Sequence, residues 1–296
     1  MVDLNLPTQR FAAYLTDRGV PVHRIIAFAG LSTLAVVDAS CRPTRGETGV
    51  AKGLCGYYHV IESLPPEVAP GAYGYYWYKR FGSGQHDAWR AAFQFEYEML
   101  RSLAPHDNWA QVWWGEMEGE IPYYVMRHYK RGSLAAHGAA EGWNLPADRV
   151  LRLSKDIATA LAALHSVGVV HRDLNAENVL LTDDGGAAVA DLGCARRLSA
   201  PPTQPRRRAD EFHWPPEYAE AYDVAGVEAD VYSLGVLMYQ MTVGRMPRHG
   251  APPAHCAPRV GRFPAALITL ADACVAYEPK DRPQSVKEIL ADLATA

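Results

Sequence analysis

Three polar side chains suited to metal binding and proton transfer occur within a short span of the sequence. Asp173 and Asn178 lie in the run His-Arg-Asp-Leu-Asn-Ala-Glu-Asn, and Asp191 opens the run Asp-Leu-Gly. Carboxylate and amide oxygens are the ligands that Mg²⁺ prefers in proteins. A carboxylate beside them can orient an attacking hydroxyl group. The residue types therefore indicate a metal site next to a candidate general base.

These side chains need a framework, and the flanking residues predict one. The apolar pair Val169-Val170 precedes the polar run and the apolar stretch Val179 to Leu181 follows it. This order favours a strand, a loop and a second strand, with the polar groups at one end of buried structure. For either motif alone, an ordinary loop with solvated carboxylates remains the alternative.

The polar run resembles the catalytic loop of eukaryotic-type protein kinases, and Asp191-Leu192-Gly193 resembles their Asp-Phe-Gly metal motif. Further motifs extend the resemblance from about residue 48 to residue 292. It implies an α+β, bilobal kinase fold, with a small β-rich N-lobe that carries one regulatory helix and a larger, mainly helical C-lobe. It also implies ATP and Mg²⁺ as cofactors and a protein as substrate.

We expect three regions along the chain: an N-terminal extension packing on the small lobe (1–45), the kinase N-lobe (46–128) and the kinase C-lobe (129–296). In the extension, Thr8 can cap a helix from about Gln9 to Asp17. Ile25 to Phe28 and Leu34 to Asp38 are expected to be strands. These strands would cover the small lobe or bind a partner, and their apolar character favours the covering role.

In the N-lobe, the stretch Val50 to Val60 resembles the kinase glycine-rich loop between two strands. Tyr75 to Phe81 is aromatic and is expected to form the third strand, whose lysine would be Lys79. Glu96 lies on a segment with helical apolar spacing and would form an ion pair with that lysine. Tyr123 to Leu134 resembles the hinge between lobes. The nucleotide-binding residues implied by the resemblance are Ala51, Gly53, Gly56, Tyr58, Lys79, Met126, Arg127 and Tyr129.

In the C-lobe, Trp214-Pro215-Pro216-Glu217 resembles the Ala-Pro-Glu motif that closes the activation segment. By this resemblance Glu217 pairs with Arg282, and Asp230 opens a long central helix and holds the backbone of the catalytic loop. Further helices are expected over Ala147–Val167, Pro264–Ala276 and Gln284–Ala294.

The resemblance assigns a role to each catalytic candidate. Asp191 and Asn178 would hold Mg²⁺ on ATP, Lys79 would anchor the phosphates, and Asp173 would accept or orient the proton of the substrate hydroxyl. Arg172 would bind a phosphate on the activation segment, where the hydroxyl candidates are Ser199 and Thr203.

Three positions depart from the family pattern. Asn175 stands where serine/threonine kinases usually carry lysine, and Asp210 lies near the place of a usual threonine. Trp77 stands two residues before Lys79, where the family has a small residue that covers the adenine. Either the tryptophan narrows the nucleotide pocket or the strand is shifted. These departures leave open a pseudokinase that acts as a nucleotide- or protein-binding module, supported by Trp77, Asn175 and Ala51. A small-molecule kinase of the aminoglycoside-phosphotransferase type is the third alternative. The expected pair of Glu217 and Arg282 argues against it, because enzymes of that type lack this link to the activation segment. The missing loop arginine of tyrosine kinases favours serine or threonine as the acceptor.

Composition sets the remaining expectations. The chain has 296 residues, 49% of them hydrophobic, and a net charge of −4. This charge gives no general reason to expect binding to nucleic acid or an anionic membrane. The longest stretch without Asp, Glu, Lys or Arg is about 15 residues, too short to span a bilayer. The five scattered cysteines favour free thiols in a cytoplasmic protein. The oligomeric state stays open.

Overall fold

The computed structural model describes residues 6–40, 48–72, 75–201, 213–247, 254–257 and 260–296. Thr203 and Asp210 lie outside these residues. The chain divides into two compact units, one formed by residues 1–104 and 111–128 and the other by residues 105–110 and 129–296.

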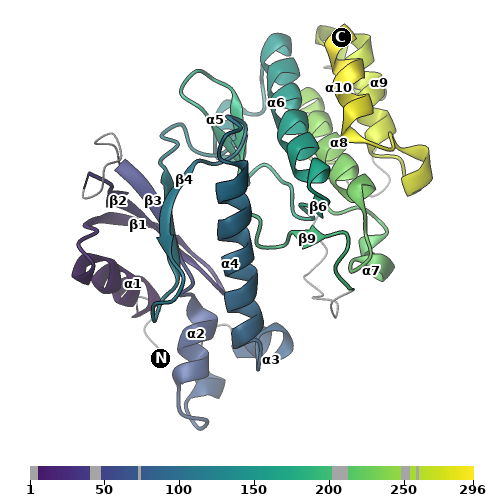
Figure 1. The fold of residues 1–296 in the computed structure, drawn as a ribbon. Helices are drawn as coiled ribbons and strands as arrows, with labels where there is room; N and C mark the ends of the chain where they lie inside the picture. Colours follow the sequence, from purple (N-terminus) through teal and green to yellow (C-terminus); the bar gives the residue numbers. More distant parts are fainter. Residues whose placement is uncertain (1–5, 41–47, 73–74, 202–212, 248–253, 258–259) are drawn as a thin grey trace. The chain divides into compact units, whose positions relative to one another are not determined.

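The first unit contains an antiparallel sheet in which the described strands follow the order β1-β2-β3-β5-β4. An antiparallel sheet in this unit and helices in the second agree with the expected α+β class (Figure 1). The strands are β1 (Val22–Phe28), β2 (Thr33–Asp38), β3 (Thr48–Gly53), β4 (Val112–Glu116) and β5 (Tyr123–Arg127).

The first two strands form where the sequence predicts them, but their role is different. β2 pairs with β3 along its whole length, from Thr33 opposite Gly53 to Asp38 opposite Thr48. These strands therefore belong to the sheet itself and do not cover it. The boundary that we expected at residue 45 falls between two paired strands.

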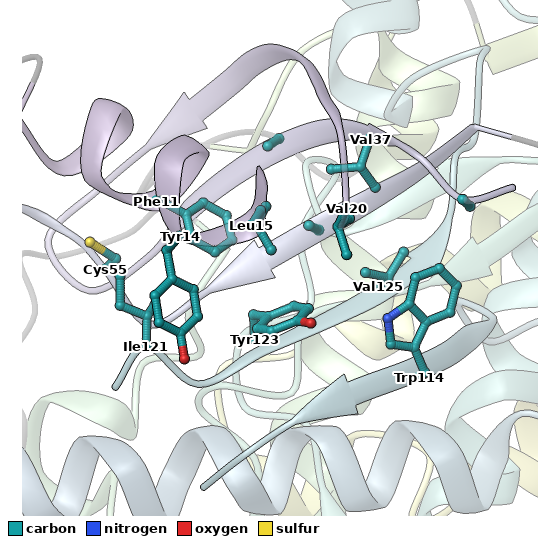
Figure 2. Packing of buried hydrophobic residues seen from close by; sticks show 13 residues of the cluster. Phe11, Tyr14, Leu15, Val20, Val37, Cys55, Trp114, Ile121, Tyr123 and Val125 are labelled. Carbon is teal, nitrogen blue, oxygen red and sulfur yellow. The ribbon is translucent and has the colours of Figure 1, made fainter. Parts of the chain in front are cut away.

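Helix α1 (Leu6–Asp17) covers one face of the sheet. It ends where Gly19 adopts a φ of +72°, a left-handed conformation that favours glycine. Phe11 and Leu15 of α1 are fully buried against alternate residues of the strands (Figure 2). The apolar face of the sheet is thus closed by the segment that precedes β1. The buried residues of this cluster are Phe11, Tyr14, Leu15, Val20, Ala35, Val37, Ala39, Ala51, Cys55, Trp114, Ile121, Tyr123 and Val125.

An insertion separates β3 from α4 (His86–Leu103), the long helix of this unit. It contains α2 (Tyr57–Ser63), a single 3₁₀ turn (Ala69–Gly71) and α3 (Tyr75–Phe81). The expectation that Tyr75–Phe81 is a strand is wrong. Strand propensity reflects the fit to a pleated surface, and this segment has no sheet neighbour among the described residues.

The second unit is mainly helical. Helix α6 (Ala147–Ser166) packs against both α8 (Val227–Val243) and α10 (Val286–Thr295), while α9 (Ala265–Cys274) packs against α8 (Figure 1). The expected helices at 147–167, 264–276 and 284–294 are confirmed to within two residues. The helices are α5 (Leu134–Glu141), α6 (Ala147–Ser166), α7 (Tyr218–Ala221), α8 (Val227–Val243), α9 (Ala265–Cys274) and α10 (Val286–Thr295), with 3₁₀ turns at Ala254–Cys256, Val260–Arg262 and Pro279–Asp281.

Two short antiparallel pairs frame the polar loop of the second unit. β6 (Val169–Val170) pairs with β9 (Arg196–Arg197), and β7 (Val179–Leu181) pairs with β8 (Ala187–Val189). The predicted order of strand, loop and strand around residues 171–178 is therefore confirmed. Among the described residues, no helix combines the length and apolar character needed to cross a bilayer.

Candidate functional site

In the first unit, a buried ion pair joins β3 to α4. Nζ of Lys52 lies 2.8 Å from Oε1 of Glu96, and the hydroxyl of Tyr124 donates a second hydrogen bond of 3.0 Å to the same oxygen. Glu96 is only 2% exposed. The expected pair of Glu96 with Lys79 is wrong, because Lys79 lies exposed on α3.

The alternation of side chains along β3 explains the position of Lys52. Successive residues of a strand point to opposite faces. Ala51 packs into the cluster under α1, so Lys52 points to the other face, where α4 provides Glu96. A buried charge is tolerated when it is paired and hydrogen-bonded, and Glu96 meets both conditions.

The residues expected to form the glycine-rich loop lie elsewhere. Ala51 and Gly53 belong to β3, and Gly56 caps the start of α2, which contains Tyr58. A Cβ atom on Gly53 would overlap the Phe11 ring, and one on Gly56 would overlap the carbonyl oxygen of Ala29. Both glycines are therefore required by close packing within this unit.

The turn between β1 and β2 is tied to the insertion. Backbone N–H groups of Tyr57 and Tyr58 donate to the carbonyls of Ala29 and Gly30, at 3.2 and 2.9 Å. The first turn of a helix leaves such N–H groups without partners inside the helix. Helix α2 therefore caps this turn with its own N-terminus.

In the second unit, Asp230 of α8 organises the catalytic loop. Its two carboxylate oxygens accept the backbone N–H groups of His171 and Arg172, each at 2.8 Å, and Nε2 of His165 lies 2.7 Å from Oδ2. Arg172 adopts a φ of +65°, which a non-glycine residue rarely does. Burial raises the pKa of Asp230, but the hydrogen bond from His165 and the neighbouring histidines outweigh it and hold this pKa below its ordinary value.

The hairpin of β7 and β8 brings Asn178 and Asp191 together. Val179 pairs with Val189, and the N–H of Ala190 donates to the carbonyl of Asn178 at 2.8 Å. Nδ2 of Asn178 donates to the carbonyl of Asp173, also at 2.8 Å. Because the amide nitrogen is engaged there, its oxygen is directed elsewhere and suits a metal ligand.

The donor set fits Mg²⁺. Asp191 adopts a φ of +64°, and its Oδ1 accepts the N–H of Gly193 at 3.1 Å, which fixes the carboxylate. An amide oxygen and a carboxylate are the hard ligands that Mg²⁺ takes, with water and substrate phosphates completing the shell. Asn178 and Asp191 are thus the residues that would hold this ion.

Asn175 stabilises the loop itself. Its Oδ1 accepts the N–H groups of Glu177 and Asn178, at 2.8 and 3.2 Å, and its Nδ2 donates to the carbonyl of Asp173 at 3.1 Å. Such contacts make an Asx turn, a usual role of asparagine. The departure from lysine at this position therefore has a structural reason.

Two residues that the sequence did not assign to the site contact the candidate base. Nε2 of His213 lies 3.1 Å from Oδ1 of Asp173, and Nε1 of Trp214 donates to the same oxygen at 3.4 Å. The sequence places these two residues directly before Pro215-Pro216-Glu217. That position does not indicate that they contact Asp173.

The activation-segment motif is locked as the resemblance implies. Arg282 makes two hydrogen bonds to the carboxylate of Glu217, at 2.7 and 2.8 Å, with its own side chain fully buried. Arg172 donates to the carbonyls of Cys194 and Tyr222 and lies over the Tyr222 ring. Its predicted binding of a phosphate stays a prediction.

The expected hinge residues fall on both sides of the division between the units. Met126 and Arg127 end β5, where Met126 is buried opposite Val50. Tyr129 opens the second unit and directs its hydroxyl to the carbonyl of Trp109 at 3.5 Å. Their predicted contact with a nucleotide stays a prediction.

Lys52 is the main functional candidate that the sequence reasoning missed. A signal was present, because Gly49-Val50-Ala51 is a short apolar run with a small residue next to the lysine. The insertion of α2 and α3 obscured this signal, because it separates Lys52 from Glu96 by 44 residues in the sequence.

Similarity to known proteins extends over most of the chain. Residues 76–293 match the protein kinase domain. The chain is 31% identical over 203 residues to the tyrosine-protein kinase SRK3 of Spongilla lacustris, which covers 63% of this chain and 60% of that protein. It is 30% identical over 207 residues to the serine/threonine-protein kinase A of Synechocystis, covering 60% of this chain and 39% of that protein.

A third relative is the probable serine/threonine-protein kinase PknB of Lactococcus lactis, 27% identical over 196 residues, with 62% of this chain and 31% of that protein covered. The matched part thus spans 60% or less of the length of these relatives. The domain match nevertheless covers most of this chain and includes the catalytic loop, the metal motif and the Glu217–Arg282 lock. The chain therefore belongs to the protein kinase family of the eukaryotic type, as its motifs predict.

Proposed function

We propose that this protein is an active protein kinase that transfers the γ-phosphate of Mg·ATP to a serine or threonine hydroxyl of a protein substrate. The observation that carries the proposal is the ordered catalytic loop. Two hydrogen bonds order it: Nδ2 of Asn178 donates to the carbonyl of Asp173, and the N–H of Ala190, the residue before Asp191, donates to the carbonyl of Asn178. Positioning and charge neutralisation are the main demands of phosphoryl transfer.

Each side chain then has a role. Asp173 orients the substrate hydroxyl and accepts its proton, and Asn178 and Asp191 bind the metal ion. Mg²⁺ bound there would neutralise charge on the phosphates of ATP. Lys52, fixed by Glu96 at 2.8 Å, takes the role of phosphate anchor that the sequence assigned to Lys79.

The choice of serine or threonine as acceptor rests on two arguments. Relatives named serine/threonine kinases occur among the similar proteins, together with tyrosine kinases. In this chain Asn175 and Glu177 occupy the positions where tyrosine kinases place an arginine, and both serve the Asx turn of the loop. The cytoplasmic location stays a prediction of the sequence.

Each residue that suggested a pseudokinase has a position in the structure that is compatible with an active enzyme. Trp77 lies on α3, Ala51 precedes the paired Lys52, and Asn175 caps its own loop. The small-molecule kinase alternative is disfavoured by the buried lock between Glu217 and Arg282.

The experiment is transfer of label from γ-labelled ATP with Mg²⁺ to the protein itself and to a generic basic protein. Asp173→Ala and Asp191→Ala should each reduce the label by at least a hundredfold while the protein remains folded by circular dichroism. Asp184→Ala, which changes an exposed carboxylate on the neighbouring β7–β8 turn, is the matched control and should keep full activity. Analysis of the labelled amino acid then tests serine and threonine against tyrosine. Equal labelling of the wild type and Asp173→Ala would disprove the proposal.

A further inference from the structure

The carboxylate of Asp173 is held by two consecutive side chains from the far end of the activation segment. Nε2 of His213 lies 3.1 Å and Nε1 of Trp214 3.4 Å from Oδ1, and the side chains of His213 and Asp173 are 8% and 14% exposed. An ionised carboxylate can only accept hydrogen bonds, and the indole N–H of Trp214 can only donate one. The contact of His213 with Asp173 is a hydrogen bond in the tautomer that carries its proton on Nε2.

His213 and Trp214 are themselves fixed from behind. The hydroxyl of Ser233, on α8, donates to the carbonyl of His213 at 3.1 Å. The Trp214 ring packs against Tyr218 and Tyr222, each with a centroid separation of 5.6 Å. Because α8 also carries Asp230, one helix positions both the loop that bears Asp173 and the histidine that contacts it.

Asn175 is not placed to do the same work. Its amide makes three hydrogen bonds to backbone groups of Asp173, Glu177 and Asn178, and none of these reaches the carboxylate of Asp173. Two donors on one carboxylate oxygen fix the rotation of the whole group, so they also fix the position of its other oxygen. Control of this rotation is what a general base needs when it must face a substrate hydroxyl.

We propose that His213 is a positioning residue of the phosphoryl-transfer site, which orients Asp173 through the Nε2–Oδ1 hydrogen bond, with Trp214 as a weaker second donor. This inference rests on the proposed function. It assigns to His213 the task of holding the base, and it makes the closing end of the activation segment a direct part of the catalytic apparatus. A rival role for the same contact is an inhibitory cap, in which His213 keeps Asp173 away from the substrate.

Steady-state kinetics of three variants test the inference. His213→Ala removes the donor, and we expect kcat to fall by about 10- to 100-fold, as displacement of a catalytic group does, with the KM for ATP unchanged within twofold. His213→Gln keeps an N–H donor at a similar reach and should recover at least a third of the wild-type kcat. His255→Ala is the matched control, because it removes an exposed histidine paired with Asp272 and should not change kcat.

The outcomes separate the possibilities. A faster His213→Ala enzyme would establish the inhibitory cap, and an unchanged one would exclude any role for the contact; either result overturns the inference. A loss that His213→Gln does not restore, in a protein with the wild-type melting temperature, also overturns it. If His213→Ala does not fold, His213→Phe replaces it as the variant without a donor. Its kcat is then compared with that of His213→Gln in the same way. A wild type no more active than Asp173→Ala would instead disprove the proposed function.

Discussion

Lys52 and Glu96 are 44 residues apart in the sequence, and their side chains form a 2.8 Å ion pair that is almost completely buried. The hydroxyl of Tyr124 completes the environment of the carboxylate at 3.0 Å. The lysine that pairs with Glu96 is therefore Lys52, whereas Lys79 is exposed on α3.

The first prediction compares the two lysines. Lys52→Met should reduce phosphate transfer by at least a hundredfold, because it removes the proposed phosphate anchor and leaves Glu96 buried without its charged partner. Lys79→Met should keep activity within twofold, since this side chain is exposed on α3. Labelling from γ-labelled ATP measures both. Equal losses in the two variants would contradict the assignment of Lys52.

The second prediction concerns the lock between Arg282 and Glu217. Arg282→Met should lower the free energy of unfolding by about 3–5 kcal/mol, the usual effect of leaving one partner of a buried pair alone. Arg10 and Glu120 form an exposed pair, with side chains 46% and 66% exposed, and Arg10→Met should cost less than about 1 kcal/mol. Urea denaturation measures both values. A small effect at Arg282 would show that the lock does not support the fold.

The third prediction concerns Asp230. Asp230→Ala leaves two buried N–H groups, those of His171 and Arg172, without their acceptor. An unsatisfied buried donor costs about 1–3 kcal/mol, so we expect a loss of stability together with a large loss of kcat. Asp272 also accepts two backbone N–H groups, those of Ala254 and His255, and Asp272→Ala is the matched control. That variant should lose stability but keep its kcat, as measured on folded protein at low temperature.

The fourth prediction concerns pH. Burial, with the nearby charges of His86, Arg10 and Arg90, lowers the pKa of His59 from 6.5 to about 4. Between these values the unfolded chain binds a proton at His59 that the folded chain does not. The contribution of His59 to the free energy of unfolding is therefore fully present above about pH 6.5 and is lost as the pH falls toward 4. The loss from this group reaches about 3 kcal/mol.

The test for His59 is the melting temperature as a function of pH. His59→Asn keeps an acceptor for the N–H of Gly56, which now donates to Nδ1 of His59 at 3.2 Å. This variant should show a smaller decline between pH 6.5 and 4 than the wild type. His255→Asn, at an exposed histidine, should retain the full decline. An identical decline in all three proteins would show that His59 does not control acid stability.

The second unit could be predicted closely from the sequence because its signals are local. The catalytic loop lies between two apolar strands within a few residues, and α6 has an unbroken apolar face. The pairing of Glu217 with Arg282 follows from family order. By contrast, the contact of His213 with Asp173 joins positions 40 residues apart, and no local pattern reports it.

The first unit was harder to predict for physical reasons. Glycines at 53 and 56 are compatible with a phosphate-binding loop, but here they allow Phe11 and the carbonyl of Ala29 to approach closely. Tyr75–Phe81 has strand propensity, but it forms a helix that contacts α2 and the 3₁₀ turn of the insertion. If Lys79 belongs to the third strand of the sheet, β1 and β2 lie too far upstream to be part of that sheet. That assignment therefore places them in an N-terminal extension.

The insertion between β3 and α4 also affects how the chain folds. Bringing Lys52 to Glu96 closes a loop of 44 residues, which costs roughly 0.8 kcal/mol more conformational entropy than a loop of ~17 residues would. The hydrogen bonds from the N-terminus of α2 to the carbonyls of Ala29 and Gly30 hold the start of the insertion beside the sheet. The loop that must still close before Lys52 meets Glu96 is therefore shorter. We therefore expect β1, β2, β3 and α2 to assemble first and α4 to dock late, so that formation of the ion pair reports the last step of small-lobe folding.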